Sequence, residues 1–151
     1  GFDRIYWFNG HGGNSSLLSV ANRELRLKHG LMTFLAHPGM PVDQGGTSPA
    51  SELGMGVHGG TDETSIMLHL AAHLCDMSKA TRRVPDKLVD NTYVRFGGRV
   101  SFGWLSNDFH PEGVIGDPTA ATAERGAELL AGSVQSFCEA LREISTFDFG
   151  R

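Results

Sequence analysis

Cysteine is scarce in this chain of 151 residues, which holds only Cys75 and Cys138. The two stand far apart and fit neither a zinc-binding nor a redox spacing. We therefore expect reduced, buried thiols, as is usual in the cytoplasm, and no disulfide framework.

Long apolar runs are missing too. No stretch approaches the about 18 consecutive apolar residues of a membrane-spanning helix, which excludes such a helix.

Positive charge is also sparse. The net charge is −4, and the densest basic spot is Arg82-Arg83. Proteins that bind nucleic acid through its phosphates need larger basic patches, so a nucleic-acid partner is disfavoured.

A starting Met is absent as well: the chain begins at Gly1 and runs directly into apolar residues. Natural chain starts usually carry loosely held polar residues, so we expect that an upstream segment is missing.

What the chain does contain is typical of a globular domain. The hydrophobic fraction is 40% and the charged fraction 20%, both in the ordinary range. The length suits one domain, residues 1–151, with a real core. Glycine is abundant at 20 residues and clusters around His and Asn.

The first quarter of the chain predicts a strand, a helix and a second strand. Residues 2–8 hold β-branched and aromatic side chains typical of a buried strand. After the Gly-rich segment 9–14, Asn14 or Ser15 caps a helix that ends at Gly30. Residues 31–36 form the second strand. This order implies parallel strands, and ligands of such sheets bind beyond the carboxyl ends, where segment 9–14 falls.

The rest of the chain is less regular. Residues 37–55 are rich in Pro and Gly and predict a long, functional loop. A second helix starts at Thr61 or Asp62, and residues 94–105 favour one strand or a hairpin. A last helix is expected to open at Asp117-Pro118, with an amphipathic stripe of Ala127, Leu130, Val134, Phe137, Leu141 and Ile144.

The segment Asn9-Gly10-His11-Gly12-Gly13-Asn14 is the first candidate site. A His at the exit of a buried strand, flanked by residues without Cβ, lets a metal or a substrate approach the backbone closely. Two alternatives remain open. The segment is a Gly-rich turn that happens to contain His, or a phosphate loop, although the third Gly of the dinucleotide fingerprint is absent and Glu24 comes too early for its acidic residue.

The second candidate is His58-Gly59-Gly60-Thr61-Asp62-Glu63-Thr64-Ser65. His58 in a loop and Glu63 in a first helical turn can point into one cleft and suit metal ligation and proton transfer. The alternative is a capping motif, with Thr61 as N-cap and the acids favoured by the helix dipole. For Asp62 alone, the capping interpretation is preferred.

The third segment, Gly113–Thr119, centres on Asp117, which either caps the last helix or shapes a substrate cleft. His69 and His73 stand one helical turn apart, but the residues between them lack the Glu of a zinc-protease helix. We interpret both as buried or half-exposed structural histidines. His29, His37 and His110 receive the same interpretation.

Taken together, the three segments resemble the creatininase family. Its members carry NGHGGN, then H-x-G-x-x-E-T-S, then G-D-P-[ST]-x-A-T-x-E-x-G, and this chain reads NGHGGN (9–14), HGGTDETS (58–65) and GDPTAATAERG (116–126). The resemblance covers nearly the whole chain. It implies an α/β fold, a three-layer sandwich with a mainly parallel sheet and helices on both faces, of which this chain would be the C-terminal part.

The resemblance also implies chemistry: a metal-dependent amidohydrolase that cleaves a C–N bond of a small cyclic or linear amide with metal-activated water. The family centre commonly holds two divalent ions, Zn with Mn or Fe possible. By motif position, His11 resembles a metal ligand and Glu63 a ligand or a partner of the metal-bound water. His58 resembles the residue that binds substrate and moves protons, and Gly12, Gly13 and Asn14 complete the implied substrate site. The family's hexamers imply a homo-oligomer.

Departures from the family pattern narrow this expectation. Creatininase proper has a Tyr-Glu pair where this chain has Gly12-Gly13, and a substrate-gripping Trp at the position of Gly54. Creatinine is therefore a poor substrate hypothesis, and the Gly-Gly form resembles formamide deformylases and the peptide-trimming enzyme of mycofactocin maturation. The family takes further Glu, His and Asp ligands from an N-terminal segment that this chain lacks. His11 and Glu63 give two ligands, below the usual three, so we expect the isolated chain to bind metal weakly and to be inactive.

Two other functions compete. One is a non-catalytic α/β module that binds an anionic small molecule at loop 9–15 and the following helix N-terminus. The other is a chain that mainly builds an oligomer interface, with Met55, Trp104 and Phe109 as exposed candidates. The hydrolase requires His11, His58 and Glu63 in one cleft, whereas the anion binder requires only the loop.

Overall fold

The computed structural model describes residues 1–39 and 46–150, and these fall into two compact units. The first unit comprises residues 1–39 and the residues from 133 onward, and the second lies within residues 46–132. The longest helix, α3 (Ala123–Thr146), contributes its first turns to the second unit and its remainder to the first. Of the long loop expected at 37–55, residues 40–45 lie outside the described part.

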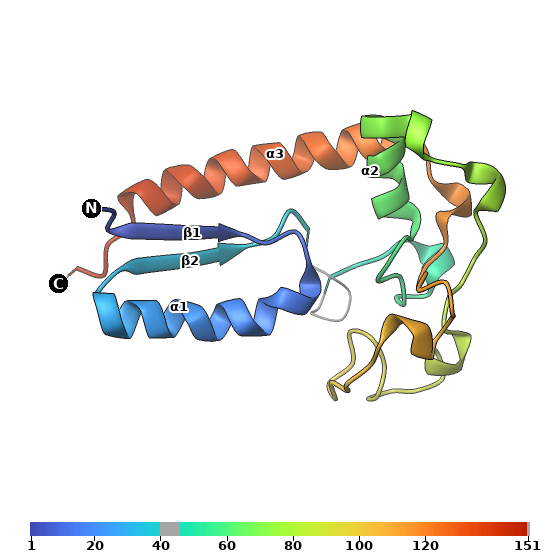
Figure 1. Cartoon of the computed structure of the whole chain (residues 1–151), viewed down its shortest axis with the longest axis horizontal. Helices are drawn as coiled ribbons and strands as arrows, with labels where there is room; N and C mark the ends of the chain where they lie inside the picture. The colour runs from blue at the N-terminus through green and yellow to red at the C-terminus, as the bar shows by residue number, and fades with distance from the viewer. Residues whose placement is uncertain (40–45, 151) are drawn as a thin grey trace. The chain divides into compact units, whose positions relative to one another are not determined.

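The first unit is built on the predicted strand–helix–strand order. Strands β1 (Arg4–Phe8) and β2 (Met32–Ala36) pair in parallel, and α1 (Ser15–His29) connects them (Figure 1). Gly30 ends α1 in the left-handed conformation, with φ 68° and its N–H donated to Arg26 O at 3.0 Å. Glycine adopts this conformation without steric cost, so the predicted helix stop is confirmed.

Helices cover both faces of this two-stranded sheet (Figure 1). On one face, Tyr6 of β1 stacks on Phe137 of α3, with ring centroids 5.7 Å apart. On the other face, Thr33 Oγ1 of β2 donates to Asn22 O of α1 at 2.9 Å. Tyr6 pairs with Phe34, which is the residue next to Thr33 in β2. Successive side chains of a strand point to opposite faces of the sheet, so Tyr6 and Thr33 lie on opposite faces. The expected α/β arrangement with helices on both faces is confirmed.

The second unit contains α2 (Thr61–Ala71), the start of α3 and short 3-10 turns. The turns are Ala50–Glu52, Ala72–Leu74, Met77–Lys79, Asp86–Leu88, Ser106–Asp108 and Pro118–Ala120. The strand or hairpin expected at 94–105 is wrong, because the described backbone there forms only an isolated bridge between Val94 and Val100. Its alternating aromatic residues, Phe102 and Trp104, are partly buried without a partner strand.

These aromatic residues instead join the core of the second unit. Met55 and Ile115 are fully buried, and Phe96 is 3% exposed. Partly buried apolar side chains pack around them: Val57, Val84, Leu88, Val89, Phe102, Trp104 and Phe109. The expectation that Met55 is exposed is therefore wrong, and Trp104 and Phe109 face this core.

Three further expectations need correction. The last helix begins at Ala123, and a 3-10 turn, Pro118–Ala120, stands at the Pro where we expected the helix to open. Within its amphipathic stripe, Val134 is 54% exposed and so faces solvent. Both cysteines are free thiols, but neither is buried as expected, because Cys75 is half-buried and Cys138 is exposed. Among the described residues, none of the helices has the length and apolar character needed to cross a membrane.

Candidate active site

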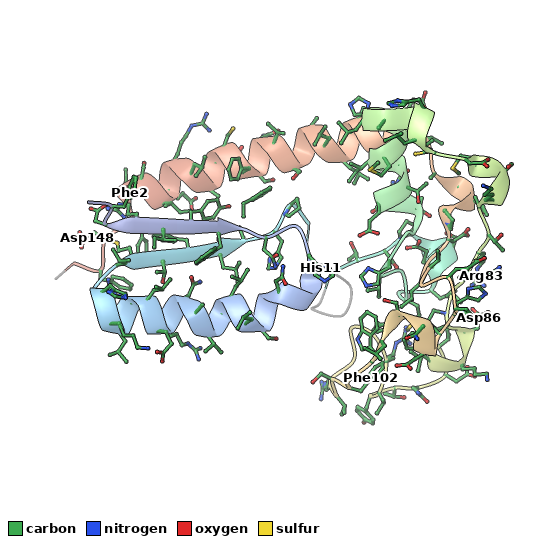
Figure 2. The ribbon with its side chains drawn as sticks, in the orientation of Figure 1. Phe2, His11, Arg83, Asp86, Phe102 and Asp148 are labelled. Atoms are coloured by element: carbon green, nitrogen blue, oxygen red, sulfur yellow. The ribbon has the colours of Figure 1, made fainter. Side chains whose placement is uncertain are left out.

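His11 is held by the side chain of Asn9, directly beyond the carboxyl end of β1. Asn9 is 5% exposed; its Oδ1 accepts the His11 N–H at 3.2 Å, and its Nδ2 donates to His11 O at 2.9 Å. Both backbone groups of His11 are therefore fixed by one buried amide. The His11 side chain is exposed at the start of the turn that leads into α1 (Figure 2). The structure thus places this imidazole at the sheet edge predicted from the sequence.

The glycines that follow His11 make room for its ring. A Cβ at Gly13 would lie 2.7 Å from His11 Nε2, closer than real Cβ atoms approach another atom. Gly12, Gly13 and Asn14 form a 3-10 turn, and Asn14 Nδ2 donates to Asn9 Oδ1 at 3.4 Å. Asn14 is the N-cap residue of α1, one of the two positions predicted, but its side chain makes no capping bond.

His37 belongs to the same polar cluster, which the sequence interpretation missed. Its Nε2 lies 3.0 Å from Asn9 Nδ2 and 2.7 Å from the Oγ of Ser15, a residue that is 5% exposed. An amide nitrogen only donates, so Nε2 of His37 accepts and a neutral ring carries its proton on Nδ1. One sequence signal was available: His37 follows β2 directly, and the carboxyl ends of parallel strands share one edge.

His58 is fixed by the core of the second unit. Its N–H donates to Ile115 O at 3.0 Å, and its carbonyl accepts the Ile115 N–H at 2.8 Å. Its half-buried ring packs against Trp104, with ring centroids 5.6 Å apart and planes at 52°. Because Ile115 is fully buried, the backbone that carries His58 is anchored to the hydrophobic core of the unit. Trp104 is a second neighbour of the site that sequence reasoning missed, since the residue was assigned to a strand.

Glu63 reaches back from α2 to the loop that carries His58. Gly60 is the N-cap residue, which makes Glu63 the third helical residue, and Glu63 Oε2 accepts the Gly59 N–H at 2.6 Å. This bond resembles the carboxylate half of a capping box. Two of the candidate residues, His58 and Glu63, are thereby linked at one loop–helix junction. The carboxylate is exposed and has a second oxygen, so it retains accepting capacity.

Thr61 has a different role from the expected one. It is the first helical residue of α2 and not its N-cap, because Gly60 holds that position in an extended conformation. Its Oγ1 donates to Asp117 O at 2.6 Å, which joins the second motif to the third. The Asp117 carboxylate accepts from Thr119 N–H at 3.1 Å and caps the turn Pro118–Ala120. Asp117 is therefore a capping residue as predicted, but it caps the turn Pro118–Ala120 and not the last helix.

Asp62 forms an ion pair that links the starts of two helices. Its Oδ1 accepts from Arg125 Nε of α3 at 2.6 Å, and this bond raises the pKa of Arg125. The preferred interpretation of Asp62 as a structural residue of the helix start agrees with this pairing.

Within residues 1–39 and 46–150, no group of three or more His, Cys, Asp or Glu side chains is arranged to hold a metal ion. His69 and His73 are both exposed, which corrects the expectation that they are buried or half-exposed. His110 lies in a turn, with Nδ1 3.6 Å from Glu112 Oε2. His11 belongs to the first unit, and His58 and Glu63 belong to the second.

The comparisons with known proteins agree with these motifs. The family model described as "Creatininase: Creatinine amidohydrolase" matches residues 1–141. The chain belongs to the creatininase family. It is 33% identical over 135 residues to the mycofactocin precursor peptide peptidase of Mycobacterium ulcerans (strain Agy99). This alignment covers 87% of this chain and 45% of the relative. The chain therefore spans about half the length of this relative.

Solved structures show the same fold at lower identity. A creatinine amidohydrolase candidate from Bacteroides fragilis NCTC 9343 superposes with a TM-score of 0.65 and 21% identity, over 100% of this chain and 57% of that one. A Zn-Zn form of a mutant creatininase gives a TM-score of 0.61 at 23% identity, over 94% of this chain and 56% of that one. A manganese creatininase gives a TM-score of 0.58 at 23% identity, over 93% of this chain and 56% of that one. The creatininase-like fold expected from the resemblance is confirmed.

Proposed function

We propose that this chain supplies His11, His58 and Glu63 to a metal-dependent amidohydrolase that cleaves a C–N bond of a small cyclic or linear amide. The observation that carries the proposal is the junction at α2. There, His58 is anchored to buried Ile115, and Glu63 is bonded to the adjacent Gly59. An imidazole and a carboxylate presented together at a helix start suit proton transfer beside a metal.

The proposed cofactor is a divalent metal, Zn or Mn, in line with the zinc and manganese forms of the related creatininases. Imidazole and carboxylate ligands suit zinc, so His11 and Glu63 fit as part of such a centre. They are two ligands where catalytic zinc usually takes three, and we propose that the others come from another part of the protein or from a partner chain. When bound, the metal lowers the pKa of a coordinated water to about 7 and makes hydroxide available.

The residues of this chain then have distinct roles in the proposal. His58 binds substrate and gives a proton to the departing amine. The N–H groups of Gly12 and Gly13, together with Asn14, orient the amide and stabilise the negative oxygen that forms during attack. The substrate class is a small non-peptide amide, and the relative named as a peptidase makes a short peptide the competing class. We further propose that the protein is a homo-oligomer, which light scattering of the purified protein tests. We also propose that it acts in the cytoplasm.

Titration of the isolated 151 residues with zinc or manganese is expected to show weak binding, because only two ligands are available. The His11→Ala variant is expected to lose what binding there is. The matched control is His29→Ala, which removes another exposed histidine of the same unit. Isothermal titration measures both. Tight one-to-one binding by the unmodified chain would contradict the incomplete ligand set.

The competing anion-binder hypothesis is tested with inorganic phosphate. If the chain only binds anions at loop 9–15, phosphate shifts the amide resonances of that loop, and neither His58→Ala nor added zinc changes the response. The hydrolase proposal expects no such saturable response in the absence of metal.

A further inference from the structure

Glu52 is a buried carboxylate that no sequence motif includes. It ends the 3-10 turn Ala50–Glu52 and is 2% exposed. Among the described residues, no Lys, Arg or His forms an ion pair with it. Burial of a carboxylate is costly unless hydrogen bonds compensate it. The contacts that Glu52 makes therefore indicate why it is there.

The Glu52 carboxylate joins two of the family motifs through their backbone. Its Oε1 accepts the N–H of Thr61 at 2.9 Å and the N–H of Asp117 at 2.9 Å. Thr61 is the first residue of α2, and Asp117 is the centre of the third motif. A negative charge at a helix N-terminus is favourable, and the N-cap residue Gly60 has no side chain to supply a capping acceptor. Glu52 thus caps α2 from a separate segment.

Three glycines leave the space that this carboxylate fills. A Cβ at Gly56 would collide with Oε2 of Glu52, and a Cβ at Gly60 would collide with Oε1. A Cβ at Gly116 would lie 3.0 Å from Oε1. The backbone therefore encloses the carboxylate from three segments, two of which carry motif residues. Such a close fit fixes these segments relative to one another.

We propose that Glu52 is a positioning residue of the candidate active site. Gly60, which lies against the carboxylate, is two residues after His58, and Glu63 is two residues after Thr61. Glu52 therefore fixes the start of α2 against the segment Ile115–Asp117, to which the His58 backbone is bonded. It acts through these residues and sets the mutual orientation of the His58 ring and the Glu63 carboxylate. The catalytic meaning of that orientation rests on the proposed function, whereas the orientation itself does not.

The test is Glu52→Gln, which keeps the shape of the side chain and removes its charge, with Glu128→Gln as the control on an exposed residue of α3. Nuclear magnetic resonance of the 151-residue chain follows the Thr61 and Asp117 amides, the His58 ring and the Glu63 carboxyl carbon. We expect about tenfold faster solvent exchange at Thr61, since a charge-assisted hydrogen bond is weakened. We also expect shifted His58 and Glu63 signals in a protein that stays folded. Glu128→Gln leaves all four groups unchanged.

A second variant covers the case in which Glu52→Gln does not fold. Glu52→Asp keeps the charge and withdraws it by one methylene, so the bonds to the two amides lengthen and the same signals shift. A folded variant with a lower melting temperature but unchanged His58 and Glu63 signals would overturn the proposal, because a merely structural acid has that effect. The readout needs neither substrate nor metal. Failure of the hydrolase proposal would appear separately, as the absence of amide hydrolysis by the metal-loaded protein across the whole panel of small amides and short peptides.

Discussion

The His58→Ala variant is expected to hydrolyse amides with a kcat roughly 100- to 10,000-fold below that of the unmodified enzyme, the range typical of a lost general acid or base. The reason is positional. The His58 ring is held between its backbone bonds to Ile115 and its packing against Trp104. A water molecule in the vacated space is not held in this way.

The measurement is amine release from a panel of small cyclic amides, linear amides and short peptides. It is made with zinc or manganese added and with the segment or partner chain that is proposed to supply the remaining metal ligands. His69→Ala is the matched control, because His69 is an exposed histidine on α2 of the same unit. Equal rates for His58→Ala and the unmodified enzyme would remove His58 from the mechanism. An equal loss in His69→Ala would show a general effect on folding.

The Gly126→Ala variant is expected to lower the free energy of unfolding by about 3 kcal/mol, the upper part of the usual range for forcing extra volume into a packed site. A Cβ at Gly126 would lie 2.5 Å from the backbone carbon of Ser65 and 2.9 Å from His69 Cβ. Ser65 is fully buried, and its Oγ accepts the Thr122 N–H at 3.1 Å where the two helices meet. Backbone atoms cannot rotate away as a flexible side chain can, so the helices must separate.

Gly132→Ala is the matched control, since Gly132 lies in the same helix with no atom within 4 Å of an added Cβ. It is expected to raise stability by up to about 1 kcal/mol through helix propensity alone. Urea unfolding of both variants gives the comparison. If Gly126→Ala were as stable as Gly132→Ala, the close contact between α2 and α3 would be wrong.

The elements that the sequence predicts well are those with strong local signals. The apolar run before Asn9 and the apolar run after Gly30 each form a strand, and the Gly at the end of α1 stops it. Glu63 in a first helical turn also follows from local spacing, because it lies three positions after the cap residue Gly60. These features depend on a few neighbouring residues, so a pattern in the sequence is sufficient to find them.

The features that the sequence does not reveal depend on tertiary burial. Glu52 is an isolated acid in a loop, and nothing local distinguishes it from an exposed one. Met55 is fully buried although its segment has no periodicity. Residues 94–105 show the alternation of a strand, yet the same alternation also occurs in a loop whose aromatic residues enter a core. A partner strand decides between these two cases, and no partner strand is visible from one segment.

The histidines illustrate the same limit at the site. The sequence alone favours a lone structural role for His37, yet its ring contacts Asn9 of the first motif and Ser15 just after it. The reverse holds for His69 and His73, whose spacing suits zinc but whose side chains lie exposed on and after α2. Residue spacing identifies ligands only where the fold brings other donors to the same place.

A zinc-loaded crystal structure of the protein, with anomalous scattering measured at the zinc edge, tests most directly the proposal that His11, His58 and Glu63 share one metal site. We predict an anomalous peak about 2 Å from a ring nitrogen of His11, with Glu63 bound to the metal or its water and His58 facing the same cleft. Zinc bound elsewhere, or these three side chains more than about 8 Å apart, would contradict it, since ligands of one ion all lie within about 2 Å of that ion.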